Sequence, residues 1–94
     1  MRARKLVGWN LRRLRVGAKV PQEALAADAE VDRAYVGRIE RGSVNVSVDL
    51  LERLAAALGV HVSAFFVAAK ESDPKPKPMP PGRRPKVTMS KKRN

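Results

Sequence analysis

Apolar residues recur at helical spacing along the first two thirds of the chain, in stretches separated by short polar or glycine-containing segments. In the first stretch Val7, Leu11 and Leu14 are three or four residues apart, and arginines occupy positions between and beyond them. Such spacing places the apolar side chains on one face of a helix. It predicts an amphipathic helix from about Leu6 to Val16, with Gly17 as its stop.

Capping and stop signals mark two further helices. Pro21 suits the entry of a second helix over residues 22–29, whose small apolar side chains permit close packing. Asp32 can cap the free amides of a third helix, and Gly42 can end that helix in left-handed geometry. The two helices are joined by a turn of only a few residues.

The capping pattern recurs twice after the third helix. Ser47 opens a fourth helix that runs to Leu58 with Gly59 as its stop, and Ser63 opens a short fifth helix. Five helices and no strands follow from these signals. The pattern therefore predicts an all-α fold.

The composition changes abruptly after Lys70. Six of the seven prolines lie between Pro74 and Pro85, interleaved with lysine, arginine and glycine, and such a segment cannot form a core. With nine Lys/Arg against two Asp/Glu, residues 70–94 are more basic than the rest of the chain. We expect a disordered tail that solubilises the protein or attracts DNA without sequence preference, although residues 82–86 loosely resemble a minor-groove AT-hook.

The chain's size and composition exclude several classes of function. A chain of 94 residues holds one small domain besides the tail, too little for a large catalytic architecture. Cysteine is absent, which suits a reducing cytoplasm, and the single His61 cannot build a zinc site without carboxylates. The acidic residues are scattered without a nucleophile or phosphate loop near them, so we expect no enzyme, cofactor or metal. The longest uncharged apolar run, residues 62–69, is too short to cross a bilayer.

The net charge of +11 attracts polyanions in general, so any sequence preference has to come from a defined surface. The third predicted helix offers one. At about 100° per residue, basic or small side chains fill an arc of about 140°, opposite an apolar side. The arc holds Arg33, Ala34, Gly37, Arg38 and Arg41, and the apolar side holds Tyr35, Val36 and Ile39.

The chemistry of this arc suits base edges in the DNA major groove. Arginine can bond O6 and N7 of guanine in a fork, and Ala34 can touch a thymine methyl group. The missing side chain at Gly37 would let the helix approach the bases closely. The alternative is a solvated helix face, which is the usual role of charged helix faces. The order of the surrounding elements favours DNA binding.

The segment from Val7 to Phe66 resembles the Cro/repressor-type helix-turn-helix family, the xenobiotic-response-element family of bacterial and phage regulators. The resemblance rests on Leu11, Arg15, Gln22, Leu25, Ala26, Val31, Val36, Ile39, Glu40, Arg41, Gly42, Asn45, Leu51, Leu54 and Leu58. It implies a compact five-helix bundle of the lambda-repressor-like DNA-binding type within residues 1–69, followed by the tail of residues 70–94. In this family the second and third helices form the DNA-binding unit.

The resemblance also implies roles for individual residues. The expected base contacts are Arg33, Ala34, Gly37 and Arg38. The expected phosphate contacts are Gln22, Lys19, Tyr35, Arg41, Ser43 and Asn45. Arg15 and Glu40 match positions where the family often makes a partly buried ion pair. Lys19 stands where the family commonly has glycine.

These observations predict a sequence-specific regulator of transcription that binds double-stranded DNA as a homodimer. Phe65 and Phe66 support the dimer, because two adjacent side chains on a short helix cannot both enter one core. Two alternatives remain open. An antitoxin-type regulator would mainly bind a protein partner, for which the tail is a candidate site, and a nonspecific nucleoid-associated protein would bind by charge alone.

Overall fold

The computed structural model describes residues 2–68, and the predicted tail of residues 70–94 lies outside this range. Within residues 2–68 the chain forms four α-helices and one 3-10 helix, without strands. In chain order these are α1 (Ala3–Gly17), α2 (Gln22–Ala29), α3 (Arg33–Glu40), α4 (Val48–Leu58) and η1 (Val62–Phe66). The all-α prediction is confirmed. The fifth α-helix is wrong, because the segment closes i to i−3 hydrogen bonds and continues after Phe66 in extended backbone.

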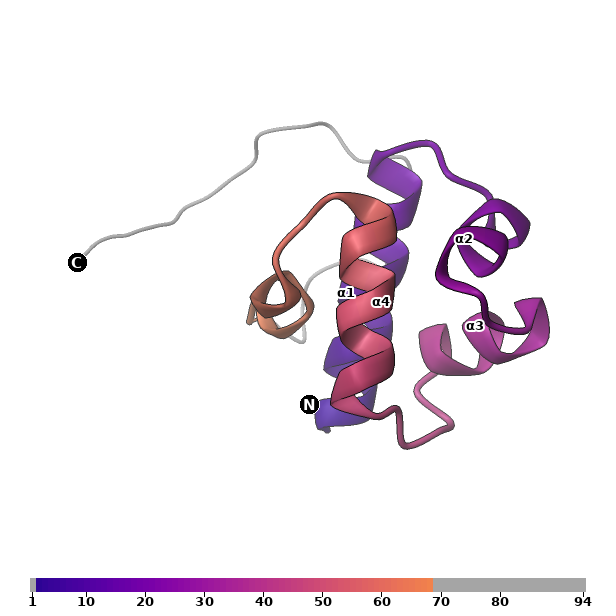
Figure 1. Cartoon of the computed structure of the whole chain (residues 1–94). Coiled ribbons are helices and arrows are strands. Elements are labelled where there is room, and N and C mark those ends of the chain that lie inside the picture. The colour runs from indigo at the N-terminus through magenta and orange to yellow at the C-terminus, as the bar shows by residue number, and fades with distance from the viewer. Residues whose placement is uncertain (1, 69–94) are drawn as a thin grey trace.

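The helices enclose one apolar core. In Figure 1 the ribbon of α4 passes in front of α1, with α2 and α3 on one side of them and η1 on the other. Helix α3 packs against α1 and α2, α2 also packs against α4, and η1 packs against α1 and α4. The largest fully buried apolar side chains are Leu11, Leu25, Val36, Ile39, Leu54 and Phe65. None of the helices within residues 2–68 has the length and apolar composition needed to cross a membrane.

All four α-helices end in the same way. The residue after the last turn is left-handed, and the next backbone N–H donates to a carbonyl five residues earlier, as in a Schellman motif. The left-handed residues are Lys19 (φ +60°), Glu30 (φ +59°), Gly42 (φ +74°) and Gly59 (φ +71°). The predicted stops at Gly42 and Gly59 are therefore confirmed. The predicted stop at Gly17 is wrong, because Gly17 is the last residue of α1 and the chain reverses at Lys19.

Replacing Lys19 with glycine is expected to stabilise the fold by about 0.5 to 1 kcal/mol. A side chain in left-handed geometry costs about 1 to 2 kcal/mol, which exceeds the extra chain entropy that glycine loses on folding. Thermal unfolding of the full chain measures the effect. A melting temperature that stays the same or falls would contradict this account of the α1 end.

A buried amide ties η1 to α1. Asn10 is fully buried, and its Nδ2 donates to the carbonyl oxygens of Phe65 and Val67 at 2.9 Å each. Its Oδ1 accepts from Nε of Arg13 at 3.2 Å, and burial lowers the pKa of that guanidinium below its usual value. Asn10 thus provides a donor for one carbonyl in η1 and one just after it.

The capping residue of η1 also differs from the prediction. The backbone N–H of Ser63 donates to Nδ1 of His61 at 3.1 Å, so His61 caps this turn and Ser63 lies inside it.

Candidate nucleic-acid interface

Helix α3 is anchored by one side and open on the other. Val36 and Ile39 are 0% and 1% exposed, and they pack into the core shared with α1 and α2. Arg33, Ala34 and Arg38 are exposed. The apolar residues therefore fix the position of the helix, while the two arginines remain free to meet a ligand in solvent.

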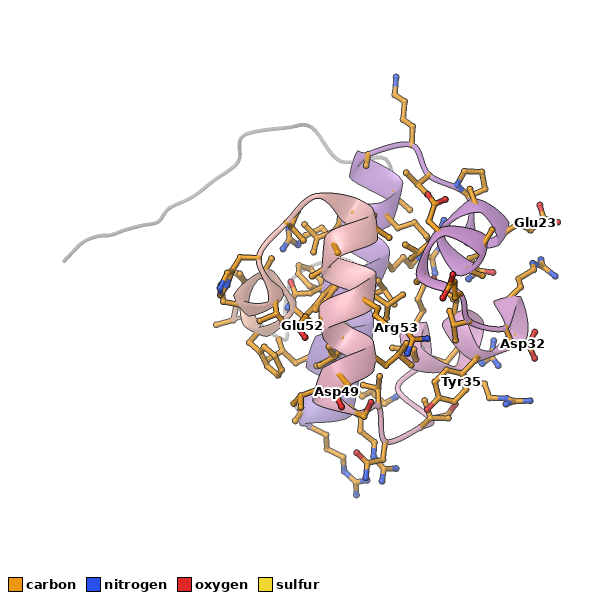
Figure 2. All side chains as sticks on the ribbon, in the orientation of Figure 1. Glu23, Asp32, Tyr35, Asp49, Glu52 and Arg53 are labelled. Carbon is orange, nitrogen blue, oxygen red and sulfur yellow. The ribbon has the colours of Figure 1, made fainter. Side chains whose placement is uncertain are left out.

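The N-terminus of α3 is capped as expected. Oδ1 of Asp32 accepts from the backbone N–H of Ala34 at 3.3 Å, which satisfies one of the free amides of the first turn. Figure 2 shows Asp32 and Tyr35 on the side of the molecule opposite η1. Tyr35 is half-buried against the edge of the core. The outer side of α3 therefore faces away from η1.

Gly37 lies on the arginine side of α3 but is not open to solvent. It is buried, and a Cβ atom added there would lie 3.3 Å from Nη1 of Arg41 and 4.0 Å from Nε2 of Gln22. Two polar side chains therefore cover the glycine. The structure differs here from the expectation of a bare gap, because Arg41 folds back along the helix.

Arg15 and Glu40 form an ion pair that joins α1 to the end of α3. Nε of Arg15 lies 2.6 Å from Oε2 of Glu40, Nη2 donates to Oε1 at 3.1 Å, and Nη1 donates to the carbonyl of Val20 at 3.0 Å. The side chains are 13% and 6% exposed, respectively. Gln22 joins the pair by donating from Nε2 to Oε1 of Glu40 at 3.0 Å. These hydrogen bonds fix the positions of α1, the start of α2 and the end of α3 relative to one another.

The other expected phosphate contacts lie in the loops at either end of the α2–α3 unit. Lys19 is exposed in the loop before α2, and Ser43 and Asn45 are exposed in the loop after α3. Figure 1 shows these two loops at opposite ends of the molecule. Ser43 is partly engaged already, because its hydroxyl donates to the carbonyl of Arg38 at 3.1 Å. The structure thus places these residues at the two ends of the α2–α3 unit.

Two residues that position α3 were not predicted from the sequence. Gly8 of α1 lies against the C-terminal turn of α3, and a Cβ atom there would lie 2.3 Å from the carbonyl oxygen of Ile39 and 2.7 Å from that of Glu40. Only glycine allows this approach. The one signal in the sequence is a glycine inside a helix, where it costs about 0.5 to 1 kcal/mol relative to alanine, and that signal does not say which element lies against it.

The second missed residue is Arg53, which supports the turn between α2 and α3. From α4 its Nε donates to the carbonyl of Ala29 and its Nη2 to that of Glu30, at 3.1 Å each. Figure 2 shows Arg53 between α4 and the α2–α3 unit. These bonds satisfy carbonyls at the end of α2, where Glu30 is left-handed. The guanidinium of Arg53 therefore has a structural role in supporting the turn between α2 and α3.

Comparison with known proteins identifies the unit. A family model described as a helix-turn-helix domain matches residues 6–64. The control protein C.BamHI of Bacillus amyloliquefaciens is 41% identical over 58 residues, which cover 61% of this chain and 72% of that protein.

Solved structures agree with the family match. The restriction-modification controller protein C.AhdI of Aeromonas hydrophila superposes with a TM-score of 0.66 at 40% identity, covering 67% of this chain and 96% of the other. A nucleoprotein complex of the controller C.Esp1396I gives a TM-score of 0.64 at 30% identity, covering 70% of this chain and 86% of the other. The resemblance inferred from the sequence is confirmed. The chain belongs to the helix-turn-helix family of DNA-binding transcriptional regulators of the Cro/repressor type.

Proposed function

We propose that the protein binds specific sites in double-stranded DNA by laying α3 in the major groove, and that it regulates transcription as a homodimer. The observation that carries this proposal is the division of α3, whose Val36 and Ile39 are buried while Arg33 and Arg38 are exposed on the same helix. A helix held in this way presents its free side chains rigidly to a groove that admits one helix.

The proposed base contacts are the exposed residues on the free side of α3. Arg33 and Arg38 each carry a planar fork of donors that matches O6 and N7 of guanine, whereas Ala34 offers a methyl group to thymine. Gly37 lies between them on the same side. Because each arginine bonds one base, the choice between DNA sequences would depend on individual base pairs rather than on total charge.

The proposed phosphate contacts flank these residues. Lys19 lies before α2, Gln22 lies at its first turn, and Ser43 and Asn45 follow α3. Tyr35 would meet the backbone from the half-buried edge of α3. Contacts of this kind fix the register of the helix along the duplex, and they weaken as salt concentration rises.

A homodimer is supported by the exposed apolar surface at η1. Phe65 is fully buried, but Phe66 and Val67 are 48% and 50% exposed. Figure 1 shows η1 on the side of the molecule away from α3. Pairing of two copies through this side would leave both α3 helices free for half-sites about 34 Å apart, one turn of DNA.

Selection of binding sites from random duplexes tests the proposal with the full chain. We expect a two-fold symmetric preferred site. Arg33→Ala and Arg38→Ala should each relax one position of the half-site and cost about 1 to 3 kcal/mol of binding energy. Arg12→Ala, which removes an arginine exposed on α1, is the matched control and should keep the preferred site.

Two outcomes would contradict the proposal. If random competitor DNA displaces the selected site almost as well as the site itself, charge alone drives binding. If Arg33→Ala and Arg38→Ala select the same site as the unaltered chain, α3 does not contact the bases.

A further inference from the structure

Two side chains cover Gly37, the guanidinium of Arg41 and the amide of Gln22. A Cβ atom at this position would lie within 4.0 Å of Nη1 of Arg41 and Nε2 of Gln22. Gly37 is nevertheless on the arginine side of α3, not on the side that packs into the core. Its bare backbone therefore forms a shallow seat that the end of Arg41 occupies.

Arg41 reaches this seat because helical geometry continues through it. Its φ and ψ are −82° and −6°, and its backbone N–H donates to the carbonyl of Gly37 at 3.1 Å. Side chains on a helix point toward its N-terminus, so a residue four positions later covers the surface of the earlier one. The guanidinium of Arg41 accordingly lies over the middle of α3 rather than beyond its end.

The middle of α3 is also the middle of the proposed base-facing arc. Arg33, Gly37 and Arg41 follow one another at intervals of four residues, each turned by about 40° from the one before. A guanidinium over Gly37 therefore lies between the positions of Arg33 and Arg38. A group in the centre of the face meets the floor of a groove, whereas groups at the edges of the face meet the phosphates.

Gln22 forms one side of this seat and is itself held in place. Its Nε2 donates to Oε1 of Glu40, and Glu40 is fixed by two hydrogen bonds from Arg15. The buried ion pair therefore limits where Gln22 can move. Gln22 and Arg41 therefore border the same glycine, and of the two the amide is held by the ion pair.

We infer that Arg41 is a specificity-determining residue, which Gly37 seats so that its guanidinium bonds a guanine edge in the major groove. This inference rests on the proposed function and replaces the phosphate contact expected for Arg41 from the sequence. Guanine O6 and N7 accept two parallel hydrogen bonds from one guanidinium. The arginine contributes the fork, and Gly37 contributes the space beneath it.

The role of Gly37 can be separated from folding. A methyl group at Gly37 would lie 3.3 Å from Nη1 of Arg41, which is the flexible end of a long side chain, and in ordinary contact with Nε2 of Gln22 at 4.0 Å. Gly37→Ala should therefore keep the fold and gain helix propensity while displacing the guanidinium.

Site selection and binding measurements on the full chain test the inference with Arg41→Ala and Gly37→Ala. Both variants should lose preference at the same single position, and discrimination there should fall by about 5- to 150-fold. The double variant should lose no more than Arg41→Ala alone. Lys19→Ala removes one positive charge at a proposed phosphate contact, and it should weaken binding to all sequences alike.

Each other result has a definite meaning. Equal weakening of all sequences by Arg41→Ala, or full retention of the preferred site by Gly37→Ala, overturns the inference. If Arg33→Ala and Arg38→Ala relax their positions while Arg41→Ala relaxes none, the inference fails and the proposed function stands. If the unaltered chain selects no site, the proposed function and the inference both fail.

Discussion

Replacing Glu40 with alanine is expected to lower the free energy of unfolding by about 3 kcal/mol, the lower end of the range for breaking a buried ion pair. The substitution leaves the guanidinium of Arg15, which is 13% exposed, without its carboxylate. It also removes the acceptor of Gln22. Thermal or urea unfolding of the full chain measures the loss, which corresponds to a fall in melting temperature of about 12 to 24 °C for a domain of this size.

Two variants control for the loss of the carboxylate itself. Glu52 is an exposed glutamate on α4, and Glu52→Ala should change stability by less than about 0.5 kcal/mol. Replacing both partners, with Arg15→Met and Glu40→Leu, should recover much of the loss because no buried charge is left alone. Unchanged stability of Glu40→Ala would show that the pair has no structural role.

Replacing Gly8 with alanine is expected to destabilise the fold by about 2 kcal/mol or more, as overpacking against rigid backbone does. The new methyl group would lie 2.3 Å from the carbonyl oxygen of Ile39, and a main-chain atom cannot move aside as a side chain can. Helix α1 would have to separate from the end of α3. Unfolding measurements on the full chain should therefore show a lower midpoint, although alanine is the better helix former by about 1 kcal/mol.

The same helix supplies a matched control. Gly17 is the last residue of α1, and a Cβ atom there would have no neighbour within 4 Å. Gly17→Ala should therefore stabilise the protein by about 0.5 to 1 kcal/mol. Opposite signs for the two substitutions would support the close contact between α1 and α3. A Gly8→Ala variant as stable as Gly17→Ala would rule it out.

Short-range signals predicted most of the helical framework. Asp32 and Ser47 cap α3 and α4 through hydrogen bonds to backbone N–H groups two or three residues later. Gly42 and Gly59 are left-handed as predicted. These interactions form within one helical turn, so the residue types involved carry the information. The prediction fails at Gly17, because the left-handed position at the end of α1 is taken by Lys19, a residue with no intrinsic preference for it.

The candidate site could be predicted only in outline. The division of α3 into a buried and an exposed side follows from its periodicity, and Val36 and Arg38 lie on the sides expected. Gly37 differs, since Arg41 and Gln22 cover it. Gln22 belongs to α2, so its approach to α3 depends on how the two helices cross.

The positions of the helices relative to one another depend on contacts between distant residues. Asn10 bonds the carbonyl of Phe65, 55 residues away, and Arg53 bonds that of Ala29, 24 residues away. Every residue has a backbone carbonyl, so the sequence does not indicate which carbonyl a distant side chain will bond. Residue order accounts for where helices begin and end and which side of each is apolar, because those preferences act over a few residues. Tertiary packing alone decides that α1 touches α3 at Gly8 and that Gln22 of α2 lies beside Gly37, because these contacts exist only after the core has brought the helices together.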